Sequence, residues 1–151
     1  MTLGDAAAAG AVAAVVSGAP STAHALLTGG DVLAPTLAAG SLLLPRETRR
    51  GRLLVAAGLA HGALSLGWAV LIAPIVPRRH PIRTGVAAGL AIAALDLGVV
   101  GRRLPRIRAL PLWPQVADHV AYGVVVAAIV ARRQRSRFAS GENSLKRPPC
   151  C

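Results

Sequence analysis

The chain has 151 residues, of which 54% are hydrophobic, and it carries a formal net charge of +11. Soluble proteins rarely combine so apolar a composition with so high a charge, whereas lipid-spanning helices joined by short basic loops require both. Nucleic-acid binding is not expected, because such interfaces also use aromatic side chains and only 3% of these residues are aromatic. The composition therefore predicts a multi-pass membrane protein.

Four apolar stretches are candidates to cross a bilayer. The clearest, residues 53–76, contains no charge and lies between Arg52 and Arg78. At about 1.5 Å per residue it would span roughly 36 Å, more than the ~30 Å hydrocarbon layer. The other predicted spans are residues 5–27, 84–101 and 114–131. We therefore expect an all-α transmembrane bundle of four spans over residues 1–133.

The first span carries a proline and a polar face. Pro20 should kink the helix and free a backbone carbonyl near Val16. Four polar residues recur there at helical spacing and are expected to face protein, because lipid offers hydroxyl groups no partner. They are Ser17, Ser21, His24 and Thr28.

Residues 31–44 are too short to cross, because fourteen residues reach only about 21 Å as a helix. Asp31 is suited to cap that helix, and we expect an interfacial or re-entrant segment. At the other end of the chain, a cluster of arginines is expected to stop the fourth span near residue 131. Residues 134–151 are polar and lack periodicity, so they are predicted to form a disordered basic tail.

Pairs of glycines at a spacing of four predict close helix contacts. Gly58 and Gly62 form one such pair in the second span, and Gly85 and Gly89 form another in the third. Small residues at this spacing let two helix backbones approach each other in a membrane. We expect both pairs to pack against neighbouring helices.

Ionisable and phenolic side chains gather in one half of the predicted bundle. If the N-terminus lies on side one, the alternation of spans places them all next to side two. They are His24, His61, Asp96, Asp118, His119 and Tyr122. Charged groups in lipid cost at least ~2.5 kcal/mol, so these residues are expected to face the bundle or a wet cavity and to find partners.

This polar cluster has a functional and a structural interpretation. It could form a proton relay, a cation site or a polar substrate pocket. Alternatively, Asp118 holds the start of its own helix and Asp96 reaches toward Arg102 or Arg103. In this interpretation His61 donates one hydrogen bond to Ser17 or Ser65. A third interpretation is an interface for another membrane protein. All three remain open from the sequence.

Metal, haem and catalytic sites are not predicted. No HxxH, HxxxH or ExxH pair is present, and the side chains of Asp118 and His119 point about 100° apart on a helix. No nucleophile and base stand at a usable spacing for covalent catalysis. The sequence therefore indicates no cofactor, no metal ligands and no catalytic residues.

Residues 94–126 resemble small four-helix integral membrane proteins of high-GC bacteria that carry no assigned function. The shared features are LDLG in the third span, an Arg/Pro-rich loop, and PQVADHxxYG at the start of the fourth. The resemblance implies a four-helix bundle in a bacterial membrane and lends no activity.

Three functions follow as hypotheses for a protein of the bacterial inner membrane. The first is a non-enzymatic subunit or accessory component of a membrane assembly, with a membrane-protein partner or a second copy. The second is a small oligomeric transporter or proton-linked carrier that uses the polar cluster. The third is a membrane enzyme acting on lipid. Arginines flank both sides of the bundle in nearly equal number, so orientation stays open.

Overall fold

The computed structural model describes residues 2–145, and the regular elements within this range are all helical. They are α1 (Leu3–Val16), α2 (Ala19–Thr28), α3 (Ala34–Gly40), α4 (Arg50–Ile72), η1 (Ala73–Ile75), α5 (Pro81–Leu95), η2 (Asp96–Val100), η3 (Gly101–Arg103), α6 (Pro105–Arg108) and α7 (Leu112–Leu145). Four stretches are long and apolar enough to cross a membrane, namely Leu3–Thr28, Arg50–Ile75, Pro81–Arg103 and Leu112–Arg137. The predicted all-α bundle of four spans is confirmed.

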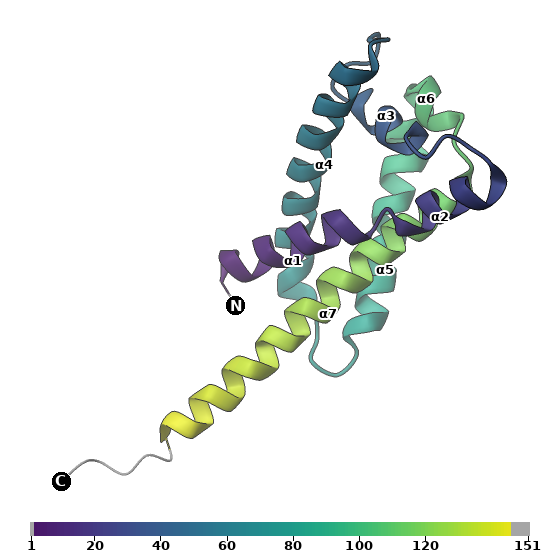
Figure 1. Cartoon of the computed structure of the whole chain (residues 1–151). Coiled ribbons are helices and arrows are strands. Elements are labelled where there is room, and N and C mark those ends of the chain that lie inside the picture. The colour runs from purple at the N-terminus through teal and green to yellow at the C-terminus, as the bar shows by residue number, and fades with distance from the viewer. Residues whose placement is uncertain (1, 146–151) are drawn as a thin grey trace.

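The long helices are not packed as four equivalent rods. In Figure 1, a loop joins the end of α4 to the start of α5, and α7 crosses α5 diagonally. The most extensive packing is between α5 and α7, and α3 lies against α4. Helix α1 contacts both α4 and α7 and so links these two layers.

Most of the buried core is alanine. Ala6, Ala9 and Ala13 of α1 are almost fully buried, and they join one cluster with larger side chains such as Ile72 and Val126. Lipid is as apolar as a leucine side chain, so close backbone packing rather than burial from water holds such helices together. The alanine-rich face of α1 permits this packing, while many larger aliphatic side chains point outward.

The contact between α5 and α7 is made by three glycines. Gly85 and Gly89 of α5 face Gly123 and the neighbouring backbone of α7. A Cβ added to Gly85 would lie 2.6 Å from the carbonyl oxygen of Gly123, and one added to Gly89 would lie 2.6 Å from the Cα of Val120. Side chains do not fit there, so the two backbones can approach only because these residues are glycine.

The contact predicted at Gly58 and Gly62 is absent from the described chain. A Cβ at either position would meet nothing within 4 Å. Helix α1 instead approaches α4 at Gly10, whose added Cβ would lie 2.8 Å from both Ala69 Cβ and the Ser65 carbonyl oxygen. The spacing of four marks a notch on a helix but does not tell which neighbour, if any, fills it.

Pro20 lies at a break between two helices. Helix α1 ends at Val16 and α2 begins at Ala19, with Pro20 in the first turn of α2. Proline has no N–H and a fixed φ, so it suits a first helical turn and cannot continue a helix interior without loss of a hydrogen bond. The break leaves unpaired backbone groups in the middle of the first span, and two other helices supply their partners, as described below.

Residues 31–44 form a short helix with turns on either side. Only Ala34–Gly40 is helical, and Gly40 touches the backbone of Leu53 at the start of α4. Asp31 does not cap this helix directly. Its carboxylate accepts the N–H of Leu33 at 2.9 Å and pairs with Arg50. The segment therefore covers the side-two end of α4 without crossing the bundle.

The structure differs from the sequence predictions at the end of the fourth span and in the segment that follows it. Helix α7 continues past residue 131 and through the arginine cluster to Leu145. Arginine and glutamine are good helix formers, so an arginine cluster can mark an exit from lipid without ending the helix. The prediction of a disordered tail is wrong for residues 134–145, and residues 146–151 lie outside the described part.

Candidate functional site: a polar cavity at the side-two end

A cavity of ≈ 510 Å³ lies between the helices, and each of α1 to α7 contributes residues to its wall. The cavity occupies the end of the bundle where α4 and α7 begin, and we call it the side-two cavity. Five of the six residues of the polar cluster line it. They are His61, Asp96, Asp118, His119 and Tyr122.

His24 is the member of the cluster that the structure places elsewhere. It is half-buried on α2 and does not contribute to the cavity wall. Thr28, the next polar residue of the expected stripe, donates its hydroxyl to the backbone carbonyl of His24 at 2.8 Å. Ser17 and Ser21 do line the cavity, so the stripe is divided between the cavity and the outer surface.

Asp96 and His119 form the central polar pair of the cavity. His119 Nε2 lies 3.3 Å from Asp96 Oδ2, and both side chains are partly buried. The contact joins the end of α5 to α7, next to the glycine contact described above. The structural interpretation of the sequence paired Asp96 with the arginines that follow it. In the structure the partner of Asp96 is His119 instead.

The geometry around His119 limits the protonation states in which this pair can be hydrogen-bonded. His119 Nδ1 lies 2.7 Å from the carbonyl oxygen of Gln115, and a carbonyl can only accept, so Nδ1 carries a hydrogen. A neutral imidazole then has a bare Nε2 facing the carboxylate of Asp96, which would place two acceptors together. A hydrogen bond between them requires one additional proton, held on His119 or on Asp96. The two side chains can therefore share a hydrogen bond only when the pair holds that additional proton.

The backbone at Asp96 is unusual. Residues Asp96–Val100 form a π-helical turn, in which the Gly101 N–H donates to the carbonyl oxygen of Asp96. Single π turns inside α-helices are rare and occur frequently at functional sites. The wider turn begins at the residue that carries the carboxylate, so it helps to set where this carboxylate enters the cavity.

Asp118 stabilises a helix other than its own. Its Oδ1 accepts the backbone N–H of Ser21 at 2.9 Å. The first N–H groups of a helix lack partners within the helix, and a carboxylate there is also favoured by the helix dipole. Asp118 therefore caps α2 after the break at Pro20, whereas the sequence had suggested that it holds the start of the fourth span.

His61 and Tyr122 provide two further links across the cavity. His61 Nε2 lies 2.9 Å from the carbonyl oxygen of Ala14, near the end of α1, and not beside a serine hydroxyl as expected. The hydroxyl of Tyr122 donates to the carbonyl oxygen of Ser65 on α4. Both bonds satisfy backbone carbonyls, so these side chains tie α4 to α1 and α7.

Trp68 adds a polar group that sequence analysis did not assign to the site. Its side chain lines the cavity, and its indole Nε1 is buried without a hydrogen-bond partner within the described chain. An indole N–H can only donate, and an unpaired buried donor costs roughly 1–3 kcal/mol. No pattern in the sequence points to this role, since a lone tryptophan near mid-helix also fits a lipid-facing position.

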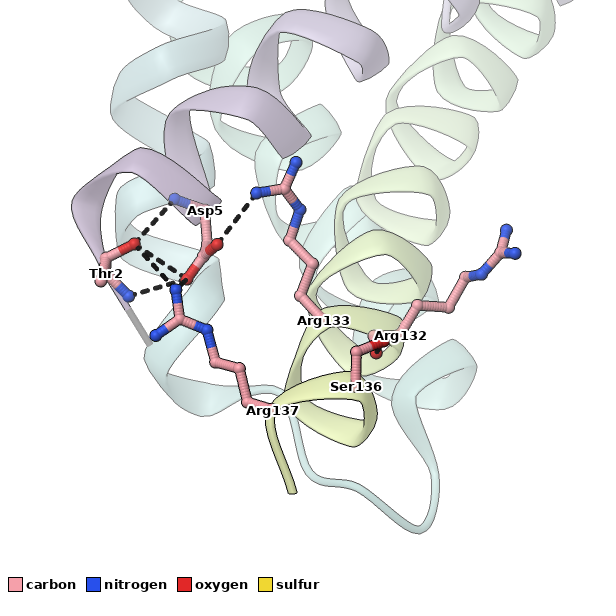
Figure 2. A network of polar contacts seen from close by, with 6 residues as sticks. All are labelled: Thr2, Asp5, Arg132, Arg133, Ser136 and Arg137. Carbon is pink, nitrogen blue, oxygen red and sulfur yellow. Dashed lines mark hydrogen bonds and ion pairs between the residues drawn. The ribbon is translucent and has the colours of Figure 1, made fainter. Parts of the chain in front are cut away.

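A second polar network lies at the opposite end of the bundle and was not predicted. Figure 2 shows Asp5 of α1 between two arginines of α7. Its carboxylate lies 2.9 Å from Arg133 Nη1 and 2.8 Å from Arg137 Nη2, and it also accepts the N–H and hydroxyl of Thr2. The Thr2-x-x-Asp5 spacing is a capping-box signal in the sequence. The pairing of Asp5 with Arg133, 128 positions away, and with Arg137 leaves no signal in the sequence.

Metal binding is not indicated by the described residues. Within residues 2–145 no three His, Cys, Asp or Glu side chains converge in a way that could hold a metal ion. The chain as a whole matches no family model, no curated protein and no solved structure. The chemistry of the cavity is therefore the basis for a functional proposal.

Proposed function

We propose that the protein is a small proton-linked carrier of the bacterial inner membrane that binds its solute in the side-two cavity. The observation that supports this most strongly is the enclosure of two carboxylates and two imidazoles around one cavity within apolar spans. Its volume of ≈ 510 Å³ falls in the range of small-molecule sites, about 300–1,000 Å³. Ionisable groups inside membrane proteins commonly mark proton relays and substrate paths.

Proton linkage is supported by the Asp96–His119 pair. With one additional proton the pair is neutral overall and internally hydrogen-bonded, whereas without it the carboxylate faces a bare nitrogen. A solute that changes the electrostatics of the cavity must change the affinity of the pair for this proton, and the reverse holds equally. Four spans are few for a carrier, so we expect the working form to be an oligomer.

The test is uptake in proteoliposomes that contain a pH-sensitive dye, challenged with a panel of small cationic, neutral and anionic solutes. We expect one class to produce a saturable internal pH change that is lost in Asp96→Asn and in His61→Ala. Asp31→Asn and His24→Ala are the matched controls, since these residues lie near the same end of the bundle but outside the cavity. Flux that persists in both cavity variants would contradict the carrier proposal.

A second candidate, an accessory subunit of a membrane assembly, is favoured by one observation. Gly58 and Gly62 form an open notch on α4 that no part of the described chain fills. Such notches receive a helix from another chain in many membrane proteins. Two results together would support this candidate over the carrier. A membrane protein should co-purify stoichiometrically with the wild type and be lost in Gly62→Leu, and neither protein should show solute-driven flux.

A further inference from the structure

We propose that the side-two cavity selects an organic cation with an apolar body. This inference rests on the proposed carrier function and adds the chemical class of the solute. It follows from the charge of the cavity wall, from its apolar surface and from the aromatic ring of Trp68 in that wall.

The cavity wall has the opposite charge to the rest of the protein. The chain contains 17 lysines and arginines, yet none of those within residues 2–145 lines the cavity, whereas Asp96 and Asp118 both do. With neutral histidines the wall therefore carries two negative charges, and with the Asp96–His119 pair protonated it carries one. Pockets lined by a single sign of charge concentrate ligands of the opposite sign.

The two carboxylates are only partly used by the protein. The Ser21 N–H contacts Oδ1 of Asp118, and His119 contacts Oδ2 of Asp96. No arginine neutralises either group in the described chain, in contrast to Asp5, which pairs with two. A carboxylate that remains without a full counter-charge in an apolar bundle is costly, and a bound cation would reduce that cost.

The rest of the wall favours an apolar body on this cation. Aliphatic side chains surround the acids, among them Ile92, Leu97 and Ile107. Trp68 contributes an aromatic surface of the kind that attracts alkylammonium groups. A small inorganic cation would leave both features unused.

The proposed cation and the proton of the Asp96–His119 pair compete. Releasing the proton raises the negative charge of the wall by one, so the deprotonated pair should bind the cation more tightly than the protonated pair. The other titratable groups of the cavity wall are Asp118 and Tyr122 from α7 and His61 from α4. Asp118 favours both the proton and the cation, and a protonated His61 would oppose both.

Trp68 provides a fluorescence readout of this site. The chain has two tryptophans, Trp68 and Trp113. Trp68 lines the cavity, whereas Trp113 is 79% exposed and does not line it. The Trp113→Phe protein therefore reports from the cavity alone, and the Trp68→Phe protein reports probe partitioning into the surrounding detergent or lipid. The probes are tetraphenylphosphonium and tetraphenylborate, which have nearly the same shape and opposite charge.

We expect tetraphenylphosphonium to produce a saturable change in Trp68 fluorescence that Trp113 does not show. Its affinity should exceed that of tetraphenylborate by about tenfold or more, and Asp118→Asn should lower it by about tenfold, which corresponds to 1.4 kcal/mol. Asn keeps an oxygen that accepts the Ser21 N–H, so this variant removes the charge while the cap of α2 remains. Asp31→Asn is the matched control and should leave the affinity unchanged.

Equal or tighter binding of tetraphenylborate would overturn the cation assignment while leaving a binding cavity, and hence the carrier proposal, in place. An Asp118→Asn protein that binds the cation as well as the wild type would also overturn it. Absence of any saturable Trp68 response to either probe overturns the assignment too, and the uptake assay above then decides separately whether a carrier function remains.

Discussion

The two ends of the bundle handle buried carboxylates in opposite ways. At the side-one end, Asp5 is 5% exposed and is paired with Arg133, Arg137 and Thr2 (Figure 2). At the side-two end, Asp96 and Asp118 line a cavity to whose wall the described chain contributes no arginine or lysine. A fully paired carboxylate holds two helices together, whereas a partly paired one in a cavity remains available for a proton or a ligand.

The largest effect should come from breaking the contact on which the cavity depends. In Gly89→Leu the new side chain would collide with the backbone of His119 and Val120, so α5 and α7 must move apart. We expect a loss of about 3 kcal/mol in the free energy of unfolding and separation of Asp96 from His119. The measurement is thermal unfolding in detergent micelles, followed by the Trp68 binding assay.

Gly62→Leu is the control for this prediction, because a side chain at Gly62 meets open space. It should leave both unfolding and binding unchanged in the isolated protein. Equal destabilisation by the two variants would show that the packing of α5 on α7 is not the specific contact described here.

Asp5→Asn and Asp96→Asn should separate the two ends of the bundle. Asp5→Asn removes the counter-charge of two arginines and should lower the unfolding midpoint more than Asp96→Asn does. Asp96→Asn should instead abolish proton-linked flux, since an asparagine cannot hold the proton of the pair. If both variants destabilise equally and both retain flux, the contrast between a structural and a functional carboxylate is wrong.

Tyr122→Phe tests the link from α7 to α4 across the cavity. Removing the hydroxyl leaves the carbonyl of Ser65 without this donor, and we expect a loss of about 1 kcal/mol in unfolding free energy. Trp113→Phe, an exposed aromatic replacement, should have no effect. An unchanged unfolding midpoint in Tyr122→Phe would mean that α4 is held by α1 and α3 alone.

The smallest effect is expected at the loop before α4. The Arg49 N–H and the guanidinium of Arg52 hold the pKa of Glu47 below its ordinary value, with a further contribution from the Thr48 N–H. A carboxyl whose pKa is lowered by folding stabilises the fold above its ordinary pKa and loses that contribution as pH falls through the lowered value. Glu47 is solvent-accessible, so the effect should be local.

Amide hydrogen exchange at Thr48 and Arg49 measures this directly. Protection should fall as the pH is lowered through the titration of Glu47, after correction for the intrinsic pH dependence of exchange, and Glu47→Gln should remove that step. A pH step that persists in Glu47→Gln must come from another group.

The four spans could be predicted from the sequence because length and hydropathy are local properties. The end of α7 could not, since Arg132–Arg137 satisfies both a lipid boundary and a continuing helix. The notch at Gly58 shows the same limit, because a spacing of four describes one helix and not its neighbour. Which helices meet depends on the break at Pro20 and on the Gly85–Gly123 contact, which are tertiary features.

Part of the candidate site could also be predicted from the sequence. Alternation of the spans places the polar cluster in one half of the bundle, and five of its six members line the cavity. Rotation of each helix about its axis decides the rest, and it turns His24 away from the cavity and Trp68 toward it. The arginine partners of Asp5 and the Ser21 partner of Asp118 lie on distant segments and have no sequence signal.

The most direct test of the account is ¹⁵N NMR of the histidine side chains in the wild type and in Asp96→Asn. The chain has four histidines, so each ring can be assigned by substitution. We predict that His119 alone changes its protonation in Asp96→Asn, with Nδ1 remaining protonated and Nε2 losing its dependence on the shared proton. A His119 spectrum that is identical in the two proteins would contradict the account, because the two side chains would then not meet in the cavity.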